Sequence, residues 1–231
     1  MEKKFFLKNS IEKIENGKSS FFLDPKEKEY VVNKLRKEHI PYQIYAPYEE
    51  AEKVLVYNGK FPEIELLELL SKEPLEHRTI LGTLFAHQIL PYFYSDIIIT
   101  EKSHYLVALK PVADYLKNQV REIGKKNIQF IKKDLKELEE YHPCYESKIY
   151  HVSSLRLDVV IARITKKSRK IVEEILNERE VFLNYEVTFK KDVFLKEGDV
   201  FSIRGYGKYR FSKIQYQNKK GNLDIEILQY K

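Results

Sequence analysis

The stretch SLRLDVVIARITKKSRK, residues 154–170, decides how the last third of this chain folds. Apolar residues recur at helical spacing over 155–164 and predict a first helix, which a short link over 165–167 follows. Ser168 can cap a second helix over 169–179. The buried face predicted for this second helix consists of Ile171, Val172, Ile175 and Leu176. The stretch therefore predicts two short helices joined by a tight turn.

Basic residues are concentrated around this turn. Five of them lie within eight positions: Arg163, Lys166, Lys167, Arg169 and Lys170. The N-terminus of the second helix adds unpaired backbone N–H groups and the positive end of a helix dipole, and phosphate oxygens favour such donors beside cations. The alternative is ordinary solvated surface charge, but cations are disfavoured at a helix N-terminus, which argues against it. The turn is a candidate phosphate-binding site.

The residues that follow predict a small sheet. Strands are expected over 181–184, 200–204, 209–214 and 223–228, with a turn over 196–199. Gly205 and Gly207 bend the chain between two of these strands, and glycine lets a backbone approach a ligand closely. Arg204, Lys208 and Arg210 form a second basic set around this bend.

The net charge of the chain, +6, is confined to the same region. Residues 151–231 hold 17 Lys and Arg against 11 Asp and Glu, whereas residues 1–150 hold 24 of each. Such an asymmetry is expected for a protein with a polyanionic partner. Composition alone leaves a lysine-rich solvated surface as an equal alternative.

Four pieces of this region resemble the S4 RNA-binding domain: Ser154–Asp158, Ser168–Lys170, Val181–Asn184 and Glu197–Gly205. The S4 pattern usually places glycine after the asparagine, where this chain has Tyr185. The resemblance implies binding to folded RNA by shape and phosphate contacts, without reading the sequence of a single strand. The RNA-binding residues that we expect are Arg156, Arg163, Lys166, Lys167, Ser168, Arg169, Lys170, Asn184, Arg204, Lys208 and Arg210.

The first 150 residues predict a mixture of helices and strands. Asp24 and Pro25 mark the start of a helix that ends before Pro41. Other helices are expected over 63–70, over 75–88 and from Pro111 to a C-cap at Gly124. Strands are expected over 43–45, 54–57, 96–100, 105–109 and 127–131. A polar stretch over 132–150 separates this part from the basic region, and the pattern indicates an α+β protein.

Ordered pieces of this part resemble the YlmH family of bacterial S4 proteins. They are Phe22–Pro25, Tyr48–Lys53, His77–Leu84, Asp96–Ile98 and Ala113–Tyr115. The family usually has a basic segment after the His-Arg helix, where this chain has Ile-Leu-Pro-Tyr-Phe over 89–93. The resemblance implies an α+β fold of three parts. These are an N-terminal α/β domain over 1–72, a central RRM-like domain over 73–145 and an S4 domain of the αL type over 150–231.

The same resemblance implies a non-catalytic, cytoplasmic factor that docks on large-subunit rRNA and peptidyl-tRNA. Its implied role is ribosome-associated quality control, where it supports the tailing of stalled nascent chains. His77 and Arg78 are candidate RNA contacts of the central domain, although a structural role at the helix start is the stronger interpretation. Tyr105 and Phe130 could stack bases, but we interpret them as core residues. We expect a monomer.

Few residues suggest catalysis. Arg156-Leu157-Asp158 superficially matches the Arg-Leu-Asp motif of pseudouridine synthases, but the flanking glycines and threonine of that motif are missing, so Asp158 is interpreted as structural. The six histidines lack metal-ligand spacing and Cys144 is the single cysteine, so we expect no metal and no cofactor. No signal peptide or membrane span is expected. Two alternatives stay open: an rRNA-modifying enzyme of the pseudouridine synthase kind, and a regulatory binder of mRNA or tRNA.

Overall fold

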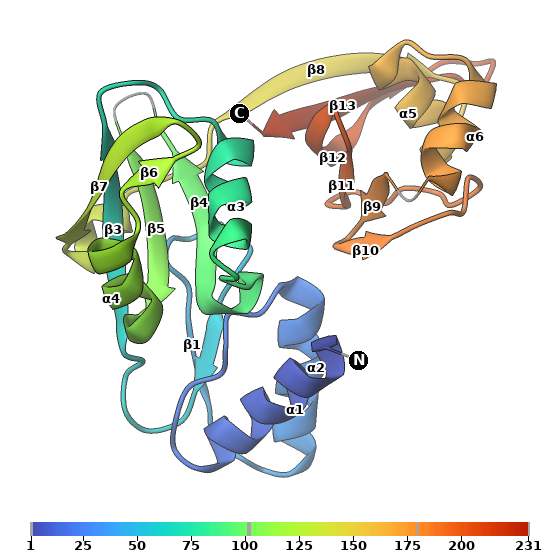
Figure 1. Ribbon diagram of the computed structural model, residues 1–231. Helices are drawn as coiled ribbons and strands as arrows, with labels where there is room; N and C mark the ends of the chain where they lie inside the picture. Colours follow the sequence, from blue (N-terminus) through green and yellow to red (C-terminus); the bar gives the residue numbers. More distant parts are fainter. Residues whose placement is uncertain (1, 101–102, 179, 231) are drawn as a thin grey trace. The chain divides into compact units, whose positions relative to one another are not determined.

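The computed structural model of the chain describes residues 2–100, 103–178 and 180–230 (Figure 1). The chain divides into two compact units, residues 1–142 and residues 143–231. Each unit combines helices with antiparallel sheet, so the predicted α+β class is confirmed. No helix within the described ranges is long and apolar enough to cross a membrane.

The N-terminal unit begins with two helices, α1 (Glu2–Glu15) and α2 (Pro25–Lys37), which pack against a two-stranded sheet. That sheet pairs β1 (Gln43–Tyr45) with β2 (Leu55–Tyr57). The predicted start of α2 is confirmed. Asp24 accepts a hydrogen bond from the Glu27 backbone at 2.8 Å, and the Glu27 carboxylate accepts one from the Asp24 backbone at 3.0 Å. This reciprocal pair satisfies two backbone donors at the helix start.

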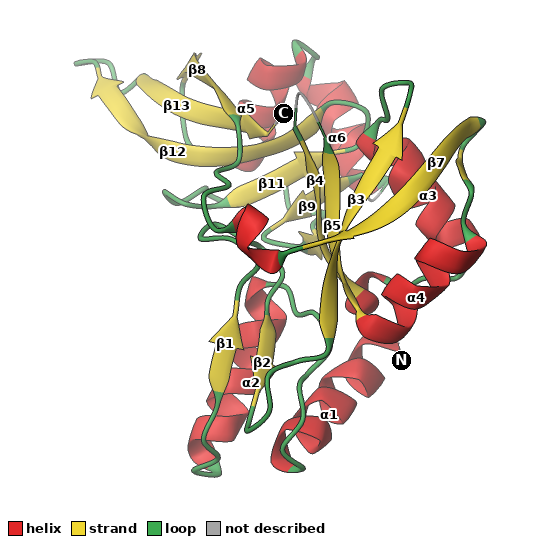
Figure 2. Cartoon of the chain, turned by 90° about the vertical axis from the view of Figure 1, so that its left-hand side faces the viewer, coloured by secondary structure: helices red, strands yellow, loops and turns green. Residues whose placement is uncertain are grey.

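A five-stranded sheet forms the rest of this unit (Figure 2). Its order is β4 (Tyr94–Ile99), β5 (His104–Leu109), β3 (Ile64–Ser71), β7 (Lys126–Lys133) and β6 (Glu122–Ile123). Helices α3 (His77–Ala86) and α4 (Lys110–Gln119) cover one face, and Phe22, Tyr48 and Leu55 pack on the other. Two short 3-10 turns, η1 (Pro91–Phe93) and η2 (Leu135–Leu138), complete the unit.

Two predictions for this unit are wrong. Residues 63–70 are not a helix but the central strand β3, in which Leu66, Leu67 and Leu69 are all buried. Its apolar residues recur at helical spacing around Glu65 and Glu68, and both faces of the strand are buried, so the pattern does not show the alternation of a half-buried strand. Gly124 is not a helix C-cap, because α4 ends at Gln119 and Gly124 instead begins the turn between β6 and β7. The hairpin predicted around 96–109 forms as β4 and β5, although residues 101–102 of its turn lie outside the described residues.

The C-terminal unit is a six-stranded antiparallel sheet with two helices on one face. The helices are α5 (Leu157–Thr165) and α6 (Arg169–Asn177), as the opening stretch predicts. The strand order is β10 (Glu186–Val187), β9 (Val181–Leu183), β11 (Val200–Ile203), β12 (Gly207–Gln217), β13 (Leu223–Tyr230) and β8 (Tyr145–Val152). Of the predicted buried face of α6, Val172, Ile175 and Leu176 are buried, whereas Ile171 is 39% exposed.

The strands also bear on the three predicted domains. The boundary after residue 72 separates β3 from β5 and β7, to which β3 is hydrogen-bonded. The S4 region expected from residue 150 gains an additional edge strand, because β8 begins at Tyr145 and pairs with β13 along its whole length. Both strands lie in stretches whose patterns do not indicate strands: β3 has a helix-like apolar run, and β8 has mostly polar and exposed residues.

Candidate nucleic-acid interface

The turn between α5 and α6 carries the cluster of cations predicted from the sequence. Lys166 ends α5 in a left-handed conformation with φ 55°, and the Ser168 hydroxyl accepts a hydrogen bond from the Ile171 backbone at 3.4 Å. This cap confirms the predicted start of α6. The five cations of the cluster are all exposed: Arg163, Lys166, Lys167, Arg169 and Lys170.

The five cations lie close together, without acidic side chains among the described residues to balance them. Within the part of the chain that the structure describes, none of the five forms an ion pair with a carboxylate. The first turn of α6 also contains no acidic residue, and Arg169 and Lys170 occupy it instead. Like charge at the positive end of a helix dipole is unfavourable without an anion. The turn therefore presents a concentrated, uncompensated positive charge beside free backbone donors.

Arg156 has a structural partner that the sequence prediction did not include. Its guanidinium donates two hydrogen bonds of 3.0 Å to the carboxylate of Asp158, which lies in the first turn of α5 and is 7% exposed. A two-point arginine–carboxylate pair is geometrically specific and strong. Asp158 is therefore a structural carboxylate, as expected, but it is buried rather than on the surface. Arg156 neutralises this carboxylate while its own side chain stays partly exposed, and its contact with RNA stays a prediction.

Arg156→Glu is expected to lower the melting temperature of the protein by far more than Lys170→Glu. The first change places two carboxylates side by side and leaves Asp158 buried without its cation, which is strongly unfavourable. The second change affects a fully exposed side chain. Thermal unfolding followed by circular dichroism measures the difference. Equal melting temperatures would contradict the structural role of Arg156.

Asn184 also serves the fold. With Tyr185 it forms the two-residue turn between β9 and β10, where both residues have positive φ. Its side-chain amide donates to the Asp199 carboxylate at 2.8 Å, and its side-chain oxygen accepts from the Val200 backbone at 2.9 Å. The Asn184 side chain therefore holds this hairpin to β11, and its contact with RNA stays a prediction.

The three residues of the second basic set, Arg204, Lys208 and Arg210, differ in exposure and in their contacts. Arg204 is exposed and lies 3.9 Å from the Glu180 carboxylate. Lys208 and Arg210 of β12 are half-buried and lie over the rings of Tyr185 in the β9–β10 turn, Tyr230 on β13 and Tyr145 on β8. Gly205 and Gly207 both have positive φ, at 80° and 123°, so the predicted bend requires glycine at these positions.

His77 and Arg78 lie at the first turn of α3 in the N-terminal unit. Both are exposed, and the Arg78 Nε donates to the Glu76 carboxylate at 2.6 Å. This local ion pair fits the interpretation of a helix-start pair. Phe130 is buried in the core under α3 and α4, and Tyr105 packs against the core on the opposite face of the sheet.

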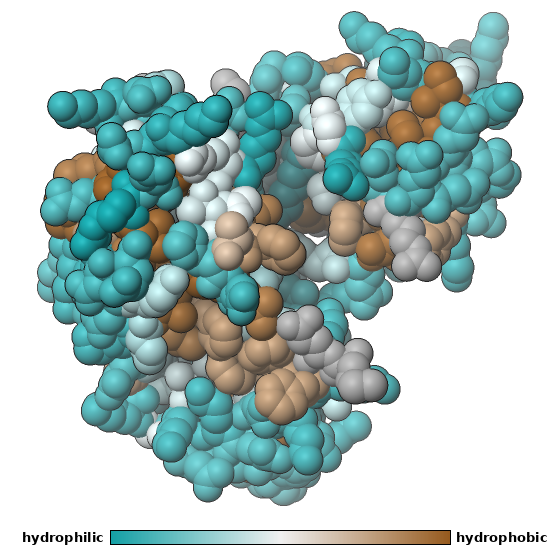
Figure 3. Space-filling model, viewed as in Figure 1, coloured by the Kyte–Doolittle hydropathy of each residue, from teal (hydrophilic) through white to brown (hydrophobic). Residues whose placement is uncertain are grey.

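Some aromatic side chains of the N-terminal unit are exposed. Figure 3 shows hydrophobic side chains at the surface of this unit among hydrophilic ones. Phe85 of α3 is 77% exposed and Phe5 of α1 is 60% exposed. Phe6 stacks on Tyr92 with ring centroids 4.2 Å apart. The 89–93 stretch, which contains no basic residue, thus contributes an aromatic ring to the packing of this unit.

Asp96 links two segments that are far apart in the sequence, strand β4 and the loop over 48–53. Its carboxylate accepts hydrogen bonds from the Tyr48 hydroxyl at 3.0 Å and from the Glu52 and Lys53 backbones at 2.8 and 3.2 Å. Burial raises the pKa of Asp96, and the nearby Glu52 carboxylate raises it further. Asp96 therefore joins strand β4 to the 48–53 loop.

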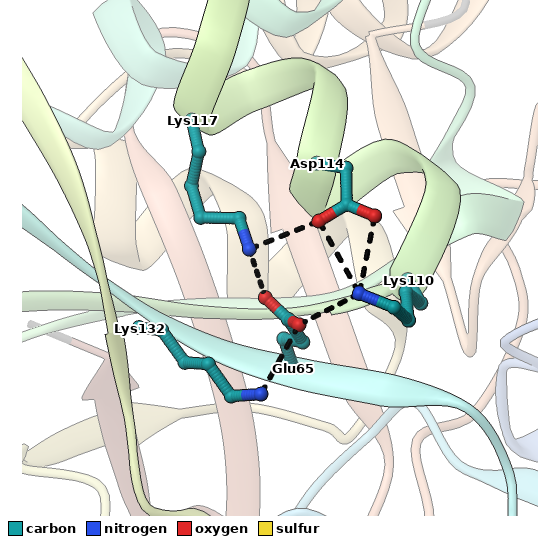
Figure 4. A network of polar contacts seen from close by, with 5 residues as sticks. All are labelled: Glu65, Lys110, Asp114, Lys117 and Lys132. Atoms are coloured by element: carbon teal, nitrogen blue, oxygen red, sulfur yellow. Dashed lines mark hydrogen bonds and ion pairs between the residues drawn. The ribbon is translucent and has the colours of Figure 1, made fainter.

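A second polar centre lies between β3 and α4 (Figure 4). The Glu65 carboxylate, only 3% exposed, accepts hydrogen bonds from Lys117 and, at 3.1 and 3.2 Å, from Lys110 and Lys132. Burial opposes ionisation of Glu65, but the three lysines outweigh it and lower its pKa. Asp114 binds Lys110 and Lys117 as well, which accounts for its place in the family pattern. These lysines are balanced internally, unlike those of the α5–α6 turn.

No group of three or more potential metal ligands occurs among residues 2–100, 103–178 and 180–230. Cys144 is exposed, without a disulfide partner.

Comparison with known proteins agrees with the pattern in the sequence. Residues 57–137, which contain the five-stranded sheet with α3 and α4, match the family model described as "Putative RNA-binding domain in YlmH". The chain is 31% identical over 146 residues to the "Ribosome-associated protein quality control protein P2" of Bacillus subtilis. This match covers 63% of the chain and 57% of the relative, so it spans little more than half of that protein.

A solved structure, the "Cell division protein ylmH from Streptococcus pneumoniae", is also similar, with a TM-score of 0.46 and 18% identity. The match covers 61% of this chain and 96% of that one. Residues 57–137 therefore match a domain model of the YlmH family, in agreement with the resemblance that the pieces of sequence indicate.

Proposed function

We propose that this protein is a non-catalytic factor that docks on folded RNA through the turn between α5 and α6. The observation that carries the proposal is the cluster of five exposed cations at the N-terminus of α6, which have no carboxylate partner among the described residues. Phosphate oxygens supply the negative charge that this arrangement lacks. Arg204, at the bend between β11 and β12, adds a further exposed cation.

We further propose the large ribosomal subunit, with its rRNA and bound peptidyl-tRNA, as the RNA target. Support comes from the name of the Bacillus subtilis relative, a ribosome-associated quality control protein. The family description of residues 57–137 as an RNA-binding domain supports an additional contact from the N-terminal unit. A role in tailing stalled nascent chains and a cytoplasmic location, which the resemblance of the sequence to the YlmH family implies, form part of this proposal.

The environment of Asp158 supports a non-catalytic role over an S4-anchored modifying enzyme. A nucleophilic carboxylate must reach its substrate, whereas Asp158 is buried and held at two points by Arg156. The Arg-Leu-Asp sequence thus has a structural explanation within α5 that requires no reaction.

Co-sedimentation of the full chain with purified ribosomal subunits tests the proposal. We expect the protein to sediment with large subunits at low salt and to be released steeply as potassium chloride increases, because phosphate contacts displace counterions. Small subunits at the same concentration are the control. Equal binding to both subunits, or binding that salt does not weaken, would count against specific docking through phosphate contacts.

A further inference from the structure

Tyr185 holds an unusual backbone conformation at the tip of the β9–β10 hairpin. Its φ is 69°, and it follows Asn184 with φ 48° in a two-residue turn that pairs Leu183 with Glu186. Glycine is the ordinary second residue of such turns, because a side chain at positive φ crowds the backbone. This chain places an aromatic ring where glycine would be less strained.

The ring of Tyr185 begins a row of alternating rings and cations across the sheet. The Lys208 ammonium lies 5.2 Å from the Tyr185 ring centroid and 4.9 Å from that of Tyr230. The Arg210 guanidinium lies 5.6 Å from the Tyr230 ring and 5.4 Å from the Tyr145 ring. It also donates a hydrogen bond of 2.8 Å to the Tyr230 hydroxyl. All five side chains are half-buried, so each keeps part of its surface open to solvent.

This row lies on the face of the sheet opposite α5 and α6. Side chains alternate between the two faces of a strand. Tyr209 and Phe211 of β12 are buried in the core beneath the two helices, which places Lys208 and Arg210 on the other face. Tyr145 and Tyr230 are directly opposite each other on β8 and β13, and their rings meet edge to face at 5.0 Å.

Carboxylates on the neighbouring strands are engaged locally. Glu146 pairs with Lys148 at 2.9 Å, and Asp224 pairs with His151 at 2.7 Å. Glu226 accepts hydrogen bonds from the hydroxyls of Ser147 and Ser212. The unit as a whole, residues 143–231, has 18 Lys and Arg against 12 Asp and Glu. This excess of positive charge over the unit favours an anionic ligand over a neutral or cationic one.

We propose that this row of Tyr185, Lys208, Tyr230, Arg210 and Tyr145 stacks the unpaired bases of an RNA strand adjoining the folded segment held at the α5–α6 turn. Bases stack on tyrosine rings and on arginine planes whatever their sequence, and interleaved cations hold the phosphates between them. The positive φ of Tyr185 is consistent with a ring retained for binding, since strained residues concentrate at functional sites. This inference rests on the proposed RNA-binding function and adds single-stranded RNA to the ligands of the protein.

Two RNA probes separate the row from the α5–α6 turn: a blunt hairpin, and the same hairpin with a short single-stranded uridine extension. Binding of each to the full chain is measured by fluorescence anisotropy. The wild type is expected to bind the extended hairpin about tenfold more tightly, from stacking of at least one base. Tyr185→Gly and Tyr230→Leu should remove this gain and leave the affinity for the blunt hairpin unchanged. Tyr30→Ala, which changes an exposed tyrosine of α2, should preserve it.

The melting temperature of Tyr185→Gly distinguishes a binding role of the ring from a structural one. We expect this variant to keep or raise the melting temperature while it loses the extra affinity for the extended hairpin. Equal affinity of the wild type for the two probes, or a gain that survives Tyr185→Gly, would overturn the inference and leave the proposed function intact if the blunt hairpin binds. Failure to bind either probe would overturn both.

Discussion

Changing Lys166, Lys167, Arg169 and Lys170 together to glutamate is expected to abolish sedimentation with large ribosomal subunits while the protein stays folded. Each lost phosphate contact lowers the slope of log affinity against log salt by about 0.7–0.9. Loss of three to four contacts should weaken binding by at least about 100-fold near physiological salt. The fold should survive, because all four side chains are exposed and α6 keeps its Ser168 cap. Glutamates in the first turn even complement the helix dipole.

A matched control carries the same change of charge on the other unit. Lys4, Lys8, Lys18 and Lys37 are exposed lysines of the N-terminal unit that lie outside residues 57–137, the part that matches the RNA-binding family model. Their joint reversal to glutamate lowers the net charge equally, so it reproduces any effect of overall charge on association. We expect this control to retain most of the binding. If both variants lose it to the same degree, the α5–α6 turn has no special role.

Asp96→Ala is expected to lower the free energy of unfolding of the protein by about 2–4 kcal/mol. The change leaves the Tyr48 hydroxyl and the backbone N–H groups of Glu52 and Lys53 without their acceptor. Asp96→Asn retains an acceptor oxygen in the same place and should lose much less. Urea unfolding of both variants measures the difference. Equal losses would show that the negative charge of Asp96, rather than its role as acceptor, stabilises the loop.

The raised pKa of Asp96 also predicts the direction in which its contribution to stability changes with pH. The folded state binds the proton of this carboxyl more tightly than the unfolded state, whose pKa is near 3.8. The contribution of Asp96 to stability therefore falls as pH rises from that value through the higher pKa of the folded state. In Asp96→Asn this component should disappear.

Local signals in the sequence were enough to predict the start of α2 at Asp24 and of α6 at Ser168. Each cap acts over three or four residues, so the residue types at the right spacing specify it directly. The basic turn followed from the same reasoning, since its cations are neighbours along the chain. That these cations are exposed and lack carboxylate partners among the described residues is seen only in the structure.

Other features depend on burial and on packing between distant segments, which the sequence does not show. The spacing of Arg156 and Asp158 does not reveal that this carboxylate is buried and held by the arginine. Strand β3 was taken for a helix because tertiary packing buries both of its faces. The row from Tyr185 to Tyr145 joins strands far apart in the sequence, so no local pattern could indicate it.

Crosslinking of the full chain to RNA in cells, followed by sequencing of the bound fragments and mapping of the crosslinked residues, tests the central claim most directly. The account predicts fragments of large-subunit rRNA, together with tRNA, and crosslinks on residues 163–170. Fragments dominated by mRNA, or crosslinks to rRNA that leave residues 163–170 unmodified, would contradict it.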